Sequence, residues 1–208
     1  MHTISVRESL RFGWETFKKR PLFFIGVVVA VIVVTSILTS VTPENPRAAF
    51  PVLLTIAVLA LNMLIEMGLV AFAIKAHDDV EKVTLHDLWH PQAFLKYVGV
   101  KILTGIIVIL GLILLVVPGV IAALALMFAT YLVIERNLGP VDALKESVRI
   151  TKGNRWKLFL LALAMLALNI LGAIALLVGL LITIPVSLLA LAHVYRTLAG
   201  KAGSSVSV

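Results

Sequence analysis

The sequence predicts an all-α, polytopic membrane protein with six transmembrane helices, arranged as three hairpins that are each preceded by an interfacial amphipathic helix. Of its 208 residues, 61% are hydrophobic and 14% are charged, against about 45–50% apolar and about 25% charged in soluble domains. The basic residues are also segregated. All but one of the 18 Lys and Arg lie before residue 21, between 75 and 101, between 136 and 157, or after 195, and Arg47 is the exception. By the positive-inside rule, this pattern places both termini in the cytoplasm.

The first unit spans about residues 3–78. Residues 5–20 place apolar side chains at helical spacing, and Ser5 with Glu8 fits a capping box at the helix start. We expect this helix to lie in the membrane interface, followed by transmembrane helices over about 22–41 and 50–75. The first apolar run is longer than the core of a signal peptide, so we expect it to be retained as a membrane helix.

The second unit spans about residues 84–135. Thr84 and Asp87 have the spacing of another helix start, which predicts a second interfacial helix. Transmembrane helices are expected over 94–117 and 120–135, joined by a tight turn at Pro118-Gly119. The last of these has an apolar part of about 15 residues, roughly 22 Å against a hydrocarbon core of about 30 Å. Whether this hairpin crosses the bilayer fully is left open.

The third unit spans about residues 139–199. Gly139-Pro140 favours the start of an interfacial helix and Gly153-Asn154 favours its end. Transmembrane helices are expected over about 156–181 and 184–199. The three units form one membrane domain over residues 1–199, and the small, polar tail at 200–208 is expected to be disordered.

The three units have the character of an internal repeat. Pro51, Pro118 and Pro185, which are predicted to open the second helix of each hairpin, are each 67 residues apart. The segment Glu8-Ser9-Leu10-Arg11 also resembles Glu146-Ser147-Val148-Arg149. These repeats have parallel topology, whereas inverted repeats are common in secondary transporters. This weakly disfavours an alternating-access mechanism.

Two long segments carry a family resemblance, residues 117–159 and 182–198, and the opening 8–24 shares it. Their most specific pieces are Pro118-Gly119, Glu146-Ser147, Lys152-Gly153-Asn154 and Pro185. The chain is similar, over nearly its whole length, to uncharacterised bacterial integral-membrane proteins related to the membrane domain of glycerophosphoryl diester phosphodiesterase. The resemblance implies a six-helix protein of the bacterial cytoplasmic (inner) membrane. The phosphodiesterase chemistry belongs to a separate soluble domain, so the resemblance supplies no catalytic residue.

Glu66 is the sharpest candidate for a functional residue. It lies within a predicted transmembrane helix, with Asn62 one turn earlier. An ionisable group at that depth costs about 2.5–3.5 kcal/mol on insertion scales, so it should be protonated, paired or next to a polar cavity. One interpretation is a proton-coupled or cation-binding site. The other, which we favour, is a hydrogen bond to Asn62 or Asn169 that holds two helices together.

Basic residues beside the predicted interfacial helices are candidate contacts for anionic lipid headgroups. They form two groups beside Trp14 and Trp156: Lys18, Lys19, Arg20, Lys145, Arg149, Lys152, Arg155 and Lys157. Because the net charge of +7 lies beside apolar spans, we expect lipids and not nucleic acid to be its partner.

A metal or cofactor is not expected. Cysteine is absent, which excludes thiolate ligands and a cysteine nucleophile. His86 and His90 have the i, i+4 spacing of zinc ligands, but Pro91 follows at once and the spacing fixes no third ligand. We expect a solvated interfacial segment there.

These observations favour a non-catalytic integral membrane protein that organises inner-leaflet lipids or partner proteins. A protein partner or a second copy of this chain is left open. The alternative is a small transporter or channel with a polar site around Glu66. An enzyme is not expected, since a single buried carboxylate without a clear partner is little basis for catalysis.

Overall fold

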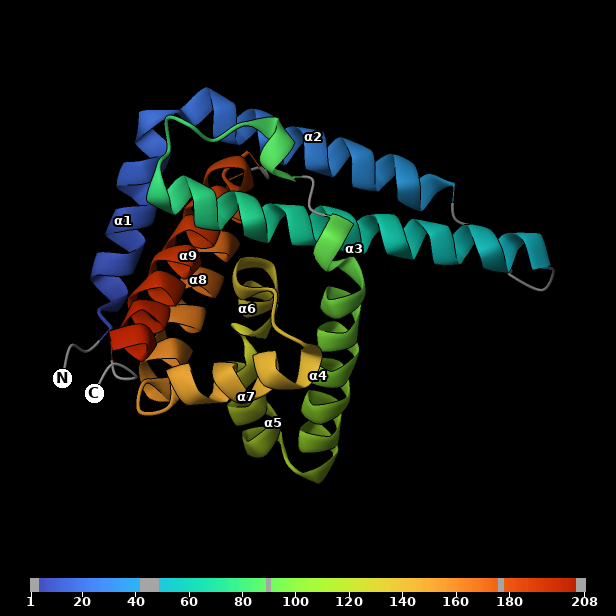
Figure 1. Ribbon diagram of the computed structural model, residues 1–208. Coiled ribbons are helices and arrows are strands. Elements are labelled where there is room, and N and C mark those ends of the chain that lie inside the picture. Colours follow the sequence, from blue (N-terminus) through green and yellow to red (C-terminus); the bar gives the residue numbers. More distant parts are fainter. Residues whose placement is uncertain (1–3, 42–48, 89–90, 176–177, 205–208) are drawn as a thin grey trace.

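The computed structural model describes residues 4–41, 49–88, 91–175 and 178–204. Six helical segments within them are long and apolar enough to cross a membrane, which confirms the predicted class. They form three hairpins (Figure 1): α2 (Pro21–Ser40) with α3 (Ala49–Asp78), α4 (Phe94–Leu114) with α5 (Val116–Leu126) and α6 (Ala129–Arg136), and α8 (Arg155–Ile174) with α9 (Leu180–Ser204).

Two amphipathic helices precede the first and third hairpins, α1 (Val6–Lys19) and α7 (Pro140–Thr151). Ser5 caps α1 as the sequence predicts, because its hydroxyl accepts a hydrogen bond from the backbone N–H of Glu8 at 3.3 Å. Before the second hairpin the chain instead forms two short 3-10 helices, η1 (Leu85–Leu88) and η2 (Pro91–Ala93). Pro91 explains the difference, since a proline interrupts an α-helix that would otherwise continue through it.

In the second and third hairpins, the chain reverses its direction at an earlier residue than predicted. The second reverses at Leu115, whose backbone is extended, so Pro118 lies in the first turn of α5 and not in the connecting turn. A first-turn proline is tolerated because the N–H that it lacks has no partner within the helix. The third hairpin likewise leaves α8 at Ile174 and enters α9 at Leu180, which places Pro185 inside α9.

Two further boundaries differ from the prediction. The helix expected over 120–135 is broken into α5 and α6 around Met127 and Phe128. At the C-terminus, α9 continues to Ser204, so the first part of the predicted disordered tail is helical. Residues 205–208 lie outside the described part of the chain.

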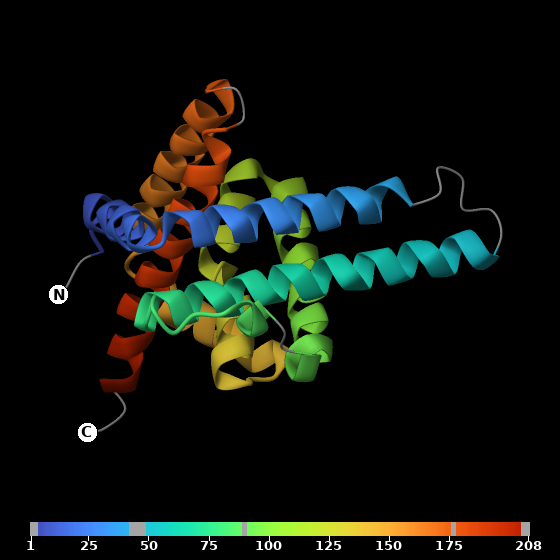
Figure 2. The same cartoon turned by 90° about the horizontal axis from the view of Figure 1, so that it is seen from above.

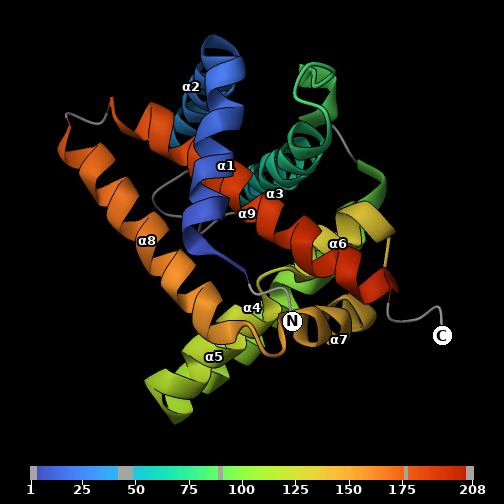
Figure 3. The ribbon, with the colours of Figure 1, turned by 90° about the vertical axis from the view of Figure 1, so that its left-hand side faces the viewer.

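The amphipathic segments pack in a cyclic order, each against the second helix of the preceding hairpin. The helix α1 packs on α9, η1 packs on α3, and α7 packs on α5 and α6 (Figure 3). Two of these contacts are close backbone approaches. Gly13 of α1 faces the Val186 carbonyl of α9, and a Cβ added to Gly68 of α3 would lie 2.9 Å from the carbonyl carbon of Leu88. A side chain at either glycine would force the paired segments apart.

The apolar residues at helical spacing in α1 and α7 are buried only in part. Phe17 and Leu144 face the bundle, whereas Trp14, Val141 and Val148 are exposed. Two small polar residues, Ser9 in α1 and Ser147 in α7, are buried beside Phe17 and Leu144 on the contact faces. Small residues let helices approach closely, which suits these positions to the contact between helices.

The three hairpins diverge from the region where their second helices meet (Figure 2). Tyr97, Phe128 and Tyr195 are fully buried in that region. At the hairpin tips, by contrast, the side chains of Leu114 and Ile174 are 75% and 73% exposed. In a chain of this composition, the surface at the tips is suited to lipid.

Candidate functional site

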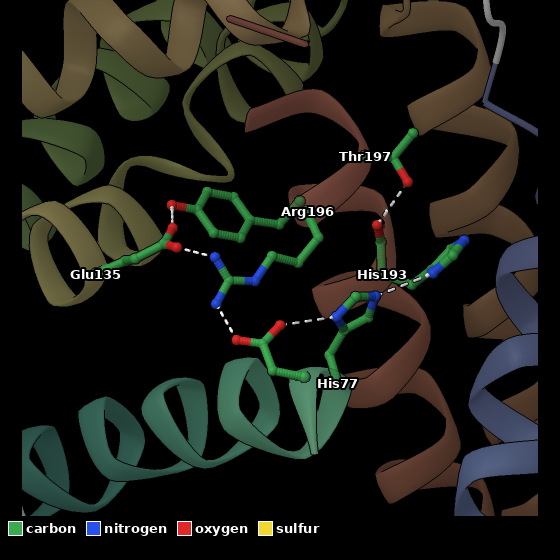
Figure 4. Close-up of polar contacts among 7 residues, drawn as sticks. His77, Glu135, His193, Arg196 and Thr197 are labelled. Carbon is green, nitrogen blue, oxygen red and sulfur yellow. Dashed lines mark hydrogen bonds and ion pairs between the residues drawn. The ribbon is translucent and has the colours of Figure 1, made fainter. Parts of the chain in front are cut away.

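One charged side chain joins the second helices of all three hairpins. The guanidinium of Arg196, in α9, donates from Nη2 to Asp78 at the end of α3 and from Nη1 to Glu135 in α6 (Figure 4). The neighbouring Tyr195 hydroxyl also donates to Glu135. We refer to Asp78, Glu135 and Arg196 as the polar hub. Because both carboxylates are paired with one guanidinium, the hub is suited to holding helices together.

Residues beside the hub contact both amphipathic helices. Beside it, His77 Nε2 lies 3.2 Å from His193 Nδ1 (Figure 4). The ring of Phe12 in α1 stacks on His193, with ring centroids 4.3 Å apart. On the other side, Arg136 pairs with Glu146 of α7 at 3.2 Å. The helices α1 and α7 are therefore connected to the second helices of the hairpins by residues that neighbour the hub.

Glu146 shows how these connections affect ionisation. Arg149 donates two hydrogen bonds to its carboxylate, at 2.6 and 2.7 Å. These hydrogen bonds hold the pKa of Glu146 below its ordinary value, although partial burial opposes the shift. Glu146 is therefore expected to be ionised at neutral pH.

A second ion pair fastens η1 to α3. Lys75 Nζ lies 2.5 Å from Asp87 Oδ1, and Asp87 also accepts hydrogen bonds from the N–H and hydroxyl of Thr84. Burial alone would raise the pKa of Asp87, but the hydrogen bonds from Lys75 and Thr84 outweigh it and hold the pKa below its ordinary value. Asp87 therefore stabilises the turn that precedes the second hairpin.

The structure brings Glu66 to an unexpected partner. Its Oε2 lies 2.5 Å from Nζ of Lys101 and accepts a longer hydrogen bond, at 3.4 Å, from the Tyr97 hydroxyl. Both partners belong to α4, which α3 crosses at this point (Figure 1). Side chains of the ion pair are 53% and 40% exposed. Glu66 thus links the first hairpin to the second, and its pairing with a cation offsets part of the cost of placing it on a membrane-spanning helix.

The two asparagines predicted to accompany Glu66 make other contacts. Asn62 Nδ2 donates to the Val58 carbonyl in its own helix at 3.0 Å. Asn169 Nδ2 donates to the Ser187 hydroxyl at 3.3 Å and joins α8 to α9 within the third hairpin. The structure therefore does not gather Glu66, Asn62 and Asn169 into one polar site.

The candidate headgroup contacts divide into two kinds. Arg20 and Arg149 are used inside the protein: Arg20 donates to the carbonyls of Val80, Glu81 and Val83, and Arg149 pairs with Glu146. Within the described residues, the other six form no ion pair. We call these the unpaired cations: Lys18, Lys19, Lys145, Lys152, Arg155 and Lys157.

The metal hypothesis gains no support from the geometry. Across the described residues, no three His, Asp or Glu side chains gather closely enough to hold a metal ion. His86 lies in η1, and His90 lies outside the described residues.

The charge pattern of the sequence does not reveal the polar hub. It indicates only that Arg196 lies among the basic residues expected in the cytoplasm. The available signal was the position of the three hub residues, since each lies near the C-terminal end of the second helix of a hairpin. If the three hairpins share one inner meeting point, charges at those ends are the ones that can pair.

Comparisons with known proteins identify a family without a known activity. The family described as "Protein of unknown function (DUF975)" matches residues 96–202. Similar proteins include uncharacterized protein Mb2590 of Mycobacterium bovis and uncharacterized proteins MT2637 and Rv2560 of Mycobacterium tuberculosis, each 29% identical over 149 residues. The matched region covers 70% of this chain and 44% of each relative, so the chain spans less than half the length of these relatives. No solved structure matches the chain. Because the family match covers just over half of its residues, this multi-pass membrane protein belongs to the DUF975 family.

Proposed function

We propose that this protein is a non-catalytic membrane scaffold that organises anionic lipids of the inner leaflet of the bacterial cytoplasmic membrane. The observation that carries the proposal is the outward face of α1 and α7. Each helix buries one face against the bundle and leaves an apolar side chain exposed, Trp14 on α1 and Val148 on α7. Unpaired cations lie beside both, Lys18 on α1 and Lys145 on α7. An exposed apolar side chain next to a free cation is the arrangement by which an interfacial helix engages lipid.

Charge distribution supports the same proposal. The carboxylates of the polar hub and of Glu146 are already paired with arginines, so they do not neutralise the unpaired cations. Each Lys or Arg near an anionic surface contributes about 1 kcal/mol. Trp156, 70% exposed at the start of α8, has the amphipathic ring that favours the headgroup level.

The proposal is tested by lipid selectivity. The protein would be reconstituted into vesicles that contain phosphatidylglycerol and phosphatidylcholine, with a spin-labelled probe of each lipid. We expect the phosphatidylglycerol probe to be enriched at the protein surface, and the enrichment to fall as salt concentration rises. If the two probes are enriched at the protein surface to the same degree, the proposal is contradicted.

A transporter or channel is the second candidate, and one observation favours it. The Glu66–Lys101 pair is half-exposed although both residues lie on membrane-spanning helices, where an exposed charge is costly unless water or a partner reaches it. Proteoliposome flux measurements with Glu66→Gln test this candidate. Solute or proton flux through the wild-type protein that is lost in Glu66→Gln, with folding retained, would establish transport and displace the scaffold proposal.

We also propose that the relationship to the membrane domain of glycerophosphoryl diester phosphodiesterase is genuine. Support comes from the motifs around Pro118-Gly119, Glu146-Ser147 and Lys152-Gly153-Asn154. Ser147 has a specific task here, because its hydroxyl donates to the Ala125 carbonyl at 2.8 Å and accepts from the Phe128 N–H at 3.3 Å, across the break between α5 and α6. A shared motif with a structural task is consistent with a shared membrane fold and needs no shared catalysis.

A further inference from the structure

An open groove lies between α5, α7 and α8, with α4 contributing to one wall. Its volume is about 590 Å³, within the usual range for ligand sites of about 300–1,000 Å³. Most of its walls are apolar and come from Ile107, Pro118, Ile121 and Leu144. Ile107 and Ile121 are 40% and 43% exposed, so part of the wall is uncovered in the isolated chain.

Two cations also line this groove, Lys145 of α7 and Arg155 at the start of α8. Both belong to the unpaired cations. The Nε of Arg155 is buried and makes no hydrogen bond. A buried donor without a partner costs free energy, so an acceptor that reached this nitrogen would stabilise the complex. Arg149, on the same helix as Lys145, is different because Glu146 already neutralises it.

The combination of an apolar wall and cations specifies the chemistry of the occupant. The walls come from helices α4, α5 and α8, which belong to segments long and apolar enough to span a membrane, and from the amphipathic helix α7. Arg155 is followed directly by the exposed Trp156, a residue type that favours headgroup depth. An occupant therefore needs an alkyl chain for the walls and an anionic oxygen for Lys145 and Arg155.

We propose that this groove binds one anionic phospholipid, with an acyl chain along Ile107, Pro118, Ile121 and Leu144 and the phosphate beside Lys145 and Arg155. This inference rests on the proposed function, but it goes further by assigning a defined site to a single lipid. It also separates Lys145 and Arg155 from the remaining unpaired cations, which would contact the leaflet only as a diffuse charge.

The test is native mass spectrometry of the purified full chain, titrated in detergent with phosphatidylglycerol and, separately, with phosphatidylcholine. We expect one phosphatidylglycerol to bind more tightly than any further lipid. The double variant Lys145→Gln/Arg155→Gln should bind this lipid roughly 30-fold more weakly, as expected for the loss of two cations near a phosphate. The matched control Lys18→Gln/Lys157→Gln removes the same charge outside the groove and should retain the tight lipid.

A third variant tests the apolar wall without a change in charge. Ala122 lines the groove, and Ala122→Phe should fill part of it and weaken the tight lipid. Retention of that lipid by Ala122→Phe, or equal losses in the two double variants, would overturn the groove site. If a general preference for phosphatidylglycerol survives in that case, the scaffold proposal stands without the site. If the wild-type protein binds both lipids equally, the scaffold proposal and the groove site both fail.

Discussion

The inner ends of the hairpins and their outer tips have opposite chemistry. At the inner ends, Arg196 pairs with Asp78 and Glu135, and a carboxylate or a guanidinium from each second helix takes part. At the tips, Leu114 and Ile174 are about three-quarters exposed and no charged side chain lies next to them in sequence. In a lipid-facing protein, apolar burial gives little preference for one helix arrangement, so packing and polar contacts must set it. The arrangement of the helices is therefore fixed mainly by polar contacts at the inner ends of the hairpins.

The largest expected effect comes from removing the central cation of the hub. Arg196→Leu leaves Asp78 and Glu135 without their shared partner, and we expect a loss of about 1.5–3 kcal/mol in the free energy of unfolding, the usual range for hydrogen bonds to charged groups. Unfolding would be followed by SDS titration in detergent micelles. The control is Arg11→Leu, which removes an exposed i, i+4 pair with Glu15 and should cost at most about 1 kcal/mol. If Arg196→Leu and Arg11→Leu lose the same unfolding free energy, the hub stabilises the fold no more than an exposed ion pair does.

A smaller effect is expected at the two serines of the repeated motif. Ser147→Ala removes the hydrogen bonds that bridge α7 to the break between α5 and α6, and should cost about 1 kcal/mol. Ser9→Ala is the matched control, because the Ser9 hydroxyl donates only to the Ser5 carbonyl within its own segment. The same SDS titration should show a clearly smaller loss for Ser9→Ala. If Ser9→Ala costs as much, the bridge across the helix break contributes nothing of its own.

Acid should weaken the pairing of Glu146 with Arg149 in α7 and with Arg136 at the end of α6. The pKa of Glu146 is lowered in the folded protein, so its stabilising contribution is fully present above the ordinary glutamate pKa. The contribution falls as the pH drops below that value, and it is lost once the pH lies below the lowered pKa. Unfolding measured across this acidic range should show a shallower pH dependence in Glu146→Gln than in the wild-type protein. Parallel profiles would mean that Glu146 is not a source of the acid sensitivity.

The smallest effect is expected at a hairpin tip. Leu114→Ala removes a side chain that is 75% exposed, and the free energy of unfolding should change by less than about 0.5 kcal/mol. The same titration measures it. A loss well above 1 kcal/mol would show that the tip is covered by something, such as a second copy of this chain or a partner protein.

The sequence predicts the class and the order of the elements because hydropathy and helix starts are local signals. The six spans, the Ser5 cap and the start of α7 at Pro140 all follow from residues close together in the chain. The break between α5 and α6 was not predictable in this way, since Ser147 bridges it from a different helix. Pro118 and Pro185 also misled the prediction of the turns, because Pro118 lies in the first turn of α5 and Pro185 lies inside α9, so neither marks a connection.

The candidate site was less predictable than the fold. Glu66 was found from its depth in an apolar helix, but its partner Lys101 depends on where α3 crosses α4, which no local pattern specifies. The same holds for Arg196 and its partners, which lie 61 and 118 residues away in sequence. The division of the basic residues into paired and unpaired cations likewise required the positions of Glu146 and of the Val80, Glu81 and Val83 carbonyls.

A double-mutant cycle on Asp78→Asn and Glu135→Gln tests whether one guanidinium couples all three hairpins. These two residues belong to different hairpins and share Arg196 as their partner. Unfolding free energies of the wild-type protein, both single variants and the double variant would be measured under one set of detergent conditions. If Arg196 couples the hairpins, we expect an interaction energy of about 0.5–3 kcal/mol between the two positions. Additivity within about 0.3–0.5 kcal/mol would contradict it, because independent contributions would mean that Arg196 does not couple the hairpins.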